Sequence, residues 1–447
     1  MYRKINEKSR GWDAKRIDIF LFLAATVLCL TFIGTNLFIK DAAAQRAELI
    51  LSRQCKDLFG ADLVGALIKE FEERHPELRL RLESADADDS GDQPATPDIV
   101  FFDEDRFKVP QAALIPLNPY LVVETGDETG ESPVEAAAGA GVETAAEQRA
   151  ILLVSFMDLL FYNIEILAAA GFDRPPKTRD EFLACAKAVS GLRAASGEAG
   201  GGFTGSGVYG AALGLSEDDP LALRRDVFSW IWAAGGDLNP PDRDGRPYFT
   251  GRTVTDVIAF LEQLNREGTF APGTFVRTGA DRIEDFAGGK IAMMIASSRE
   301  IPFLRKRMNS SAFGVTIIPG PSVAAKNHIA LSGVYAGISA GCPRPDEAWT
   351  FLAFLAEKSP ALAAGLEAVP GSLPEFPGAF SGDYIKDDPL YSKALDIFEA
   401  SEIVQGFSGQ SVEELEHAVR EELRLFFERD QSPADTAAAI QRRWDSL

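Results

Sequence analysis

The chain has 447 residues and a formal net charge of −22, from 45 basic and 67 acidic residues. This acidic balance excludes nucleic acid as a partner, because phosphate binding needs a basic surface. The 3 histidines and 4 cysteines show no spacing typical of a zinc site or a disulfide framework. We therefore expect no metal and no other cofactor, while spacing alone leaves open whether Cys55, Cys185 or Cys342 pair.

The N-terminal region, residues 1–46, predicts a membrane anchor. Residues 19–39 carry no charged side chain and are long enough to cross a bilayer. Mostly basic residues precede them, which predicts a single pass through the cell (inner) membrane with the remaining chain in the periplasm or extracellular space. A cleaved signal peptide is the alternative, because Ala42, Ala43 and Ala44 fit a cleavage site. The length of the apolar segment favours the anchor.

The chain beyond residue 46 exceeds one hydrophobic core and predicts two lobes. Its first part alternates strands and a helix, which indicates a largely parallel sheet covered by helices. Period-2 and helical patterns predict a strand at 48–52, a helix at 61–74, and strands at 78–83 and 98–102.

Later segments continue the alternation. Patterns and stop signals predict helices at 163–170 and 281–287 and a buried strand at 291–295. Thr178 with Glu181, and Ser411 with Glu414, have the spacing of capping boxes. Cys185 lies on a helical apolar stripe, which favours a core position.

Four segments carry more specific motifs. They are LFYNIEILAAAGF with PPKTRDEF (160–172 and 175–182), DFAGGKIAMM (285–294), FGV to IPGP (313–321), and GISA to EAWTFL (337–352). In this order they resemble the extracytoplasmic solute-binding proteins of ABC importers, in the maltose-binding-protein-like sugar-binding group.

The resemblance implies a two-lobed α/β fold of the class II periplasmic-binding-protein type. It places 47–154 and 312–341 in the first lobe, and 155–311 and 342–447 in the second. It further implies a monomer, not an enzyme, that captures a carbohydrate or related polar solute between closing lobes. Such a protein delivers its ligand to ABC permease subunits in the membrane.

The segment 97–107 is similar to a cleft-lining segment of the same group. The resemblance gives Phe102 a stacking position against a sugar ring, beside Asp103, and gives Asp105 and Arg106 hydroxyl-binding positions. An ordinary surface pair of Asp105 with Arg106 is the alternative. Aromatic faces and planar hydrogen-bonding groups suit a sugar chemically.

A second aromatic cluster contains Phe228, Trp230 and Trp232. In the resembling proteins an aromatic pair here lines the cleft. Two indoles at i and i+2 do not share a helix face, so one belongs to the core, and we favour Trp230 for the ligand. Loops expected near the cleft contribute the remaining candidates, Lys56, Asp57, Phe156, Asp158, Ser298, Arg299, Ser332 and Tyr335.

The sequence departs from the resembling group after the strand at 291–295. Ser298, Arg299 and Glu300 replace an aromatic residue there. Arg299 with Arg106 points to an anionic ligand as an alternative to a neutral sugar. Two other functions stay open: a membrane-tethered sensory or adhesive ectodomain, and a hydrolase using Asp103 and Asp105. The hydrolase is disfavoured because no nucleophile–base arrangement is recognisable.

Overall fold

The computed structural model describes most of the chain beyond residue 45. The described residues are 46–83, 96–103, 113–120, 143–144, 147–195, 207–219, 221–236, 238, 248–309, 311–324, 328–359, 362, 369–370, 388–404, 412–429 and 431–446. The predicted anchor (19–39), the alternative cleavage site at Ala44, and Asp105 and Arg106 lie outside them. Within these ranges, no helix is both long and apolar enough to cross a membrane.

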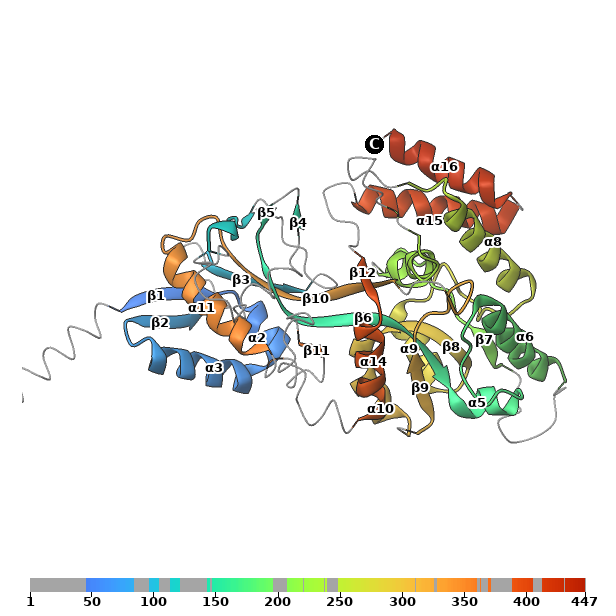
Figure 1. Ribbon diagram of the computed structural model, residues 1–447, viewed down its shortest axis with the longest axis horizontal. Helices are drawn as coiled ribbons and strands as arrows, with labels where there is room; N and C mark the ends of the chain where they lie inside the picture. Colours follow the sequence, from blue (N-terminus) through green and yellow to red (C-terminus); the bar gives the residue numbers. More distant parts are fainter. Residues whose placement is uncertain are drawn as a thin grey trace, which may run out of the picture.

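The first lobe is built on three parallel strands (Figure 1). Strand β1 (Ala47–Leu51) pairs with β2 (Leu78–Leu82) on one side and β3 (Ile99–Asp103) on the other, as the alternating pattern predicted. Helices α2 (Gln54–Phe59), α3 (Ala61–Arg74) and α11 (Pro345–Glu357) pack on this lobe. The short strands β4 (Glu143–Thr144) and β5 (Glu147–Gln148) pair with each other.

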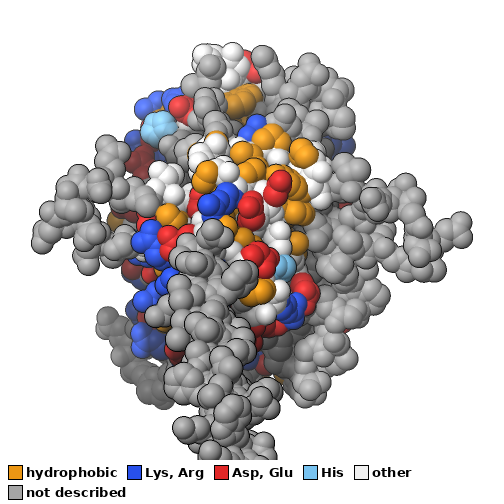
Figure 2. All heavy atoms as spheres, turned by 90° about the vertical axis from the view of Figure 1, so that its left-hand side faces the viewer, with side chains coloured by type: hydrophobic (Ala, Val, Ile, Leu, Met, Phe, Trp, Pro, Cys, Tyr) orange, Lys and Arg blue, Asp and Glu red, His pale blue; other side chains and the backbone are white. Residues whose placement is uncertain are grey.

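The outer surface of this lobe mixes both signs of charge. Figure 2 shows the left-hand end of Figure 1, where basic and acidic side chains lie next to one another. Between α3 and α11, Arg74 lies 3.1 Å from Glu357, and Lys358 lies 2.7 Å from Glu70. The excess of acidic residues is therefore partly offset by local pairs, each worth little because it is exposed to solvent.

Two long antiparallel strands connect the lobes (Figure 1). Strand β10 (His328–Ile338) pairs with β3 at its carboxyl end and with β6 (Ile151–Asn163) along its middle. The second half of β6 then pairs with β8 (Ile291–Ser297) and β9 (Phe313–Thr316) of the other lobe. Both crossing strands are almost wholly buried, so they form a continuous connection between two hydrophobic cores.

The second lobe surrounds β8, which pairs in parallel with β7 (Tyr209–Ala211). Two short strands complete the sheet, β11 (Val369–Pro370) against β6 and β12 (Glu402–Val404) against β10. The helices of this lobe are α5 (Ile164–Ala169), α6 (Arg179–Ala195), α7 (Ser229–Trp232), α8 (Arg252–Arg266), α9 (Gly279–Ala287), α10 (Ile301–Arg307), α14 (Pro389–Glu399), α15 (Val412–Arg429) and α16 (Pro433–Asp445). Helices α15, α16 and α8 lie together at its outer edge (Figure 1).

The predicted lobe boundaries need two corrections. Helix α11, expected in the second lobe, packs in the first, where Phe351 lies 4.9 Å from Phe71 of α3. Strand β9, expected in the first lobe, pairs with Leu160–Asn163 of β6 in the second. The expectation of a largely parallel sheet holds for β1–β3 and β7–β8 but not for the crossing strands, which are antiparallel.

The elements predicted from local sequence patterns agree with the structure better than the predicted division into lobes does. The helix predicted at 61–74 has those bounds, and the N–H of Glu181 donates to the Thr178 hydroxyl at 3.2 Å. Cys185 is buried in the core of the second lobe, as its helical spacing predicted. Cys55, Cys185 and Cys342 are all free thiols, so no disulfide forms among these three.

Candidate functional site

An ion pair joins the two lobes where their strands meet. Asp103 is the last residue of β3 and is fully buried, while Arg299 follows β8 in the short helical turn Ser298–Glu300 (η5). An oxygen of the Asp103 carboxylate lies 2.7 Å from Nη1 of Arg299. This pair places a first-lobe carboxylate and a second-lobe guanidinium at one position.

The turn that carries Arg299 is fixed to the crossing strand β6. The Met157 N–H donates to the Ser298 hydroxyl at 3.2 Å, and the Arg299 N–H donates to the Ser297 hydroxyl at 3.3 Å. The Arg299 guanidinium carbon lies 3.9 Å from the centre of the Phe156 ring, a cation–π contact. Arg299 is thus oriented by both its backbone and its side chain.

On the first-lobe side, Phe102 and Tyr335 form a stacked aromatic pair. They face each other across β3 and β10, with ring centres 5.4 Å apart and planes inclined by 14°. Leu114, Ala150 and Leu152 pack around this pair. One face of each ring is therefore already occupied by protein.

A cavity of about 120 Å³ opens beside Arg299 in the second lobe. The end of β8, the turn η5, the start of α9 and the segment before α7 supply its walls. The lining residues are Asp158, Leu221, Arg225, Gly279, Arg282, Ile283, Met294, Ile295, Ala296, Ser297, Arg299 and Glu300. Because Arg299 also bonds Asp103, the cavity adjoins the lobe junction.

Four buried charged residues, Asp219, Arg225, Asp226 and Arg282, form a closed network at this cavity. One Asp219 oxygen accepts from Arg225 at 2.6 Å and from Arg282 at 3.0 Å. One Asp226 oxygen accepts from Arg225 at 3.2 Å and also from Arg282. We call these four residues the charge quartet.

Two glycines leave room for the quartet. A Cβ at Gly214 would lie 2.1 Å from the guanidinium carbon of Arg282, and one at Gly279 would lie 3.0 Å from Nη1 of Arg225. Gly214 is therefore needed for space, whereas a Cβ at Gly279 would be tight and Arg225 would have to shift by a few tenths of an ångström; neither glycine has a positive φ.

Burial dominates the titration of the quartet. It raises the pKa of Asp226 to about 8, and repulsion from Asp219 and Asp158 adds to the rise against the opposing attraction of Arg225. Burial alone would lower the pKa of the Arg225 guanidinium, but the neighbouring carboxylates outweigh it and raise that pKa. Asp158 itself lies 3.5 Å from Arg224.

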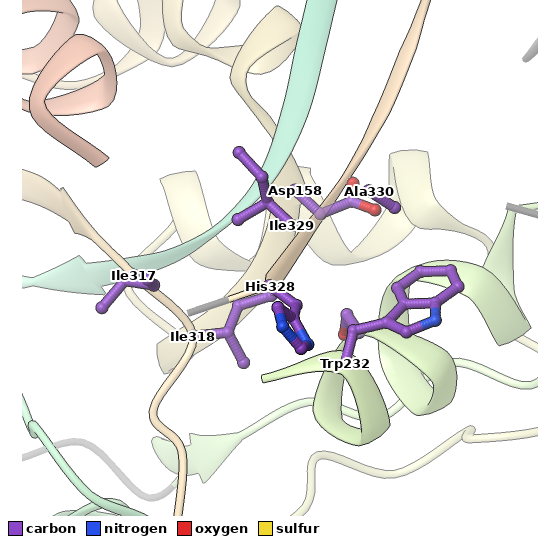
Figure 3. Close-up of a pocket in the computed structure, with 8 residues that line it drawn as sticks. Asp158, Trp232, Ile317, Ile318, His328, Ile329 and Ala330 are labelled. Atoms are coloured by element: carbon purple, nitrogen blue, oxygen red, sulfur yellow. The ribbon is translucent and has the colours of Figure 1, made fainter. Parts of the chain in front are cut away.

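Asp158 separates this cavity from a much smaller one, shown in Figure 3. The smaller space, about 10 Å³, is lined by Asp158, Ser229, Trp232, Ile317, Ile318, His328, Ile329 and Ala330. This volume corresponds to about one water molecule. His328 lines it while its Nε2 lies 3.0 Å from Glu402 of β12. A solute does not fit here.

The structure brings together eight of the residues predicted from the sequence. Phe102, Asp103, Phe156, Asp158, Ser298, Arg299, Ser332 and Tyr335 all lie on β3, β6, β10 or η5 around the lobe junction. Lys56 and Asp57 are exposed on α2 and line neither of the two cavities.

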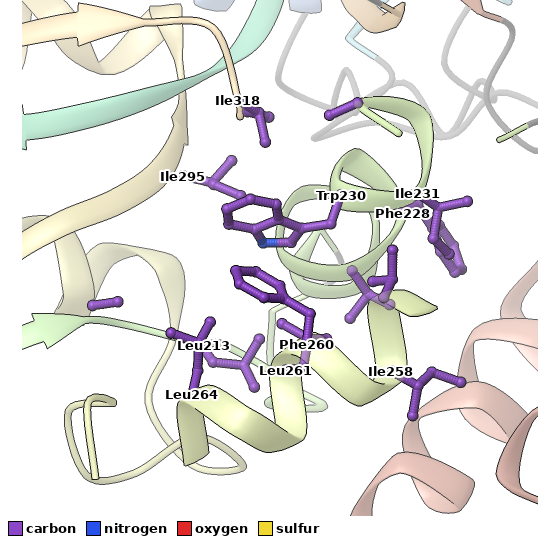
Figure 4. Packing of buried hydrophobic residues seen from close by; sticks show 14 of the residues in the cluster. Leu213, Phe228, Trp230, Ile231, Ile258, Phe260, Leu261, Leu264, Ile295 and Ile318 are labelled. Carbon is purple, nitrogen blue, oxygen red and sulfur yellow. The ribbon is translucent and has the colours of Figure 1, made fainter. Parts of the chain in front are cut away.

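The aromatic cluster of the second lobe lies elsewhere, which corrects our preference for Trp230. Its ring packs edge-on against Phe182 at 5.0 Å, and only 4% of the residue is exposed. Figure 4 shows its ring beside that of Phe260, with ring centres 5.1 Å apart. Phe228 and Trp232 are also core residues, and Trp232 in addition borders the smaller cavity. Both indoles therefore belong to the core, and Trp230, the one favoured for the ligand, lines neither of the two cavities.

Sequence reasoning missed Arg224, Asp219, Asp226 and Arg282. Arg224, Arg225 and Asp226 interrupt an otherwise apolar segment, 221–232, which leads into α7. Consecutive charges inside an apolar segment signal a buried pair, because an unpaired buried charge is too costly. The partner on α9, Arg282, is distant in sequence and carries no such signal.

Comparisons with known proteins agree with this architecture. The model of the family described as bacterial extracellular solute-binding protein matches residues 66–393. A comparison with curated protein sequences finds no match.

Solved structures share the fold at low sequence identity. The cyclic alpha-maltosyl-1,6-maltose binding protein of Arthrobacter globiformis has a TM-score of 0.68 at 17% identity, over 90% of this chain and 98% of that one. The sugar-binding protein MalE of Xanthomonas citri has 0.66 at 17%, over 90% and 97%. UgpB of Mycobacterium tuberculosis, in complex with glycerophosphocholine, has 0.62 at 19%, over 90% and 98%.

Proposed function

This chain belongs to the bacterial extracellular solute-binding proteins, and we propose that it is the solute-binding component of an ABC importer. Its ligand is a carbohydrate or a related polar solute, held between the two lobes. Its partners are the permease subunits in the membrane. It performs no chemistry on the ligand.

The observation that carries this proposal is the junction of Asp103 with Arg299. Two lobes connected by β6 and β10 meet there through one charged pair, beside a cavity that opens in the second lobe. Lobes joined by a few crossing strands close by hinge motion around a ligand. Polar groups from both lobes at one place are what such closure requires.

Relatives of the same fold bind polar solutes of different charge. The Arthrobacter globiformis protein is a binding protein for a cyclic maltosyl-maltose, and UgpB was solved with glycerophosphocholine. Both ligands carry several oxygen atoms that accept hydrogen bonds. The proposal for this chain is therefore a hydroxyl-rich ligand, with Phe102, Asp103, Asp158, Arg299, Ser332 and Tyr335 as the residues nearest to it.

We also propose that residues 19–39 hold this binding domain at the outer side of the cell membrane. Their uncharged sequence and the basic residues before them support this. A tether raises the effective concentration of the binding domain beside its permease.

The proposal is tested by calorimetry on the purified full chain with a panel of sugars and polyols. A ligand that binds only the folded state also raises the melting temperature, so both measurements are expected to select the same compounds. X-ray scattering is expected to show a smaller radius of gyration at saturation. Conversion of a bound sugar into products would contradict the proposal that the chain only binds its ligand. Binding without a smaller radius of gyration would contradict lobe closure.

A further inference from the structure

We propose that the cavity beside the charge quartet holds one neutral polyhydroxy ring, of the size of a monosaccharide, through hydrogen bonds rather than aromatic stacking. The inference rests on the proposed function and narrows its ligand class. It excludes two alternatives: an oligosaccharide stacked along the cleft, and a phosphorylated or carboxylated sugar.

The size of the cavity limits the ligand. Its volume is about 120 Å³, whereas a closed cavity of roughly 150 Å³ holds one benzene ring. Arg299 and Glu300 line it beside the lobe junction, so the substituents of one six-membered ring extend toward that junction. A second sugar ring exceeds the volume of this cavity.

The charges around the cavity disfavour an anion. Within the part of the chain that the structure describes, the guanidinium groups that line it or pair with its lining are Arg224, Arg225, Arg282 and Arg299, and the carboxylates are Asp103, Asp158, Asp219, Asp226 and Glu300. Four positive charges against five carboxylates give a net charge of −1, or 0 when Asp226 is protonated. A ligand with a negative charge therefore gains no net attraction from these groups.

Paired charges suit hydroxyl groups. A hydroxyl both donates and accepts, so it bonds a carboxylate and a guanidinium at once. Hydrogen bonds to ionised groups are stronger than those between neutral ones. Among the described residues, Nη1 of Arg225 has no protein acceptor, and Arg225 lines the cavity. Leu221, Ile283 and Met294 offer an apolar wall to the C–H groups of a ring.

Among the residues that the structure describes, the lining of this cavity contains no aromatic side chain. Phe102 stacks on Tyr335, the ring of Phe156 is covered by the Arg299 guanidinium, and Trp230 lies in the core. Long sugar chains bind through flat aromatic faces. Because no aromatic ring lines the cavity and these rings each have one face covered, recognition falls to the polar groups of the cavity.

The experiment measures dissociation constants by calorimetry for the full chain with three matched panels. They are neutral monosaccharides and cyclitols, the phosphates of the same sugars, and the di- and trisaccharides of the same sugars. Leu221→Trp and Ile283→Phe each narrow the cavity from a partly buried position, and Ile164→Phe on the exposed face of α5 is the matched control. Thermal melts verify that each variant is folded.

The tightest ligand is expected among the neutral single rings. Leu221→Trp and Ile283→Phe are expected to weaken its binding by about tenfold or more, and Ile164→Phe to leave it unchanged. A sugar phosphate or an oligosaccharide that binds tenfold tighter would overturn this inference but keep the proposed function. If neither Leu221→Trp nor Ile283→Phe weakens binding, the ligand binds outside this cavity. If no compound of the three panels binds, both proposals fail.

Discussion

The carboxylate of Asp103, fully buried at the end of β3, lies 2.7 Å from the guanidinium of Arg299, which belongs to the other lobe. The same guanidinium covers the ring of Phe156 on a crossing strand. One side chain therefore contacts both lobes and the connection between them. Removing Arg299 takes from the buried Asp103 carboxylate its ion pair with the second lobe.

We predict that Arg299→Ala lowers the free energy of unfolding by about 3 to 5 kcal/mol, because breaking a buried pair exposes the full cost of the remaining charge. The double variant Asp103→Asn with Arg299→Gln is expected to recover most of this loss. Urea denaturation followed by circular dichroism measures both.

A matched control is available on the surface. Arg307 lies 2.7 Å from Glu284, at the same distance, but the two side chains are 55% and 50% exposed. Arg307→Ala is expected to cost less than about 1 kcal/mol. If Arg299→Ala and Arg307→Ala lower the free energy of unfolding equally, burial of the ion pair at the lobe junction contributes nothing to stability.

The charge quartet predicts a pH dependence of stability. Burial raises the pKa of Asp226 from 3.8 to about 8, so between these values the folded state holds a proton that the unfolded chain has lost. The stabilisation from this proton is complete below about pH 4, falls as the pH rises, and is lost above about pH 8. Its slope is at most about 1.4 kcal/mol per pH unit.

Asp226→Asn cannot titrate and is expected to flatten the decline in melting temperature between pH 4 and pH 8. The groups that face Asp226 are Arg225, Arg282, Asp219 and Asp158, and all four remain in this variant. Asp256→Asn, at a side chain that is 60% exposed, is the control and keeps the slope of the natural chain. An unchanged slope in Asp226→Asn would assign the decline to other groups.

Because Trp230 lies in the core, we expect its substitution to lower stability. Substitution of a residue that contacts the ligand would instead lower affinity. Trp230→Ala removes a ring packed between Phe182 and Phe260 and is expected to cost about 3 to 5 kcal/mol of stability, with ligand affinity nearly unchanged. Trp349→Ala is the comparison, since that ring is only partly buried against Tyr120, and its loss is expected to be smaller. Lost affinity with unchanged stability in Trp230→Ala would restore the stacking role.

The sequence predicted local elements well because their signals are local. The helix at 61–74 and the Thr178 cap depend on side chains within a few residues of each other. The position of α11 depends instead on Phe351 meeting Phe71 across most of the chain, and no periodicity encodes which core an apolar face joins. The same limit explains why a period of 3.6 could not decide between Trp230 and Trp232.

The candidate site was predictable only in part for the same reason. Phe102 and Asp103 belong to a segment with a recognisable strand pattern, so their position at the end of strand β3 was expected. Arg299, which had suggested an anionic ligand, pairs with Asp103 in the structure. Asp219 and Arg282 meet only after the chain has folded, and their burial together depends on glycine at 214.

Gly214 gives the most direct test of the quartet's packing. Its missing Cβ would lie 2.1 Å from the Arg282 guanidinium carbon, and Arg282 cannot move aside without leaving Asp219 and Asp226. Gly214→Ala is expected to cost about 1 to 3 kcal/mol. Gly65→Ala on the exposed side of α3 has nothing within 4 Å and is expected to stabilise by about 0.5 to 1 kcal/mol, since alanine favours a helix.

Gly214→Ala and Gly65→Ala both replace glycine by alanine, but their effects on stability have different causes. A second measurement separates these causes. In an Arg282→Met background the clash at Gly214 is relieved, because the planar guanidinium is gone. Gly214→Ala is then expected to cost less than it does in the natural chain, while Gly65→Ala keeps its effect. Additive costs of Gly214→Ala and Arg282→Met would mean that Arg282 does not set the space at Gly214, because residues in direct contact give non-additive energies.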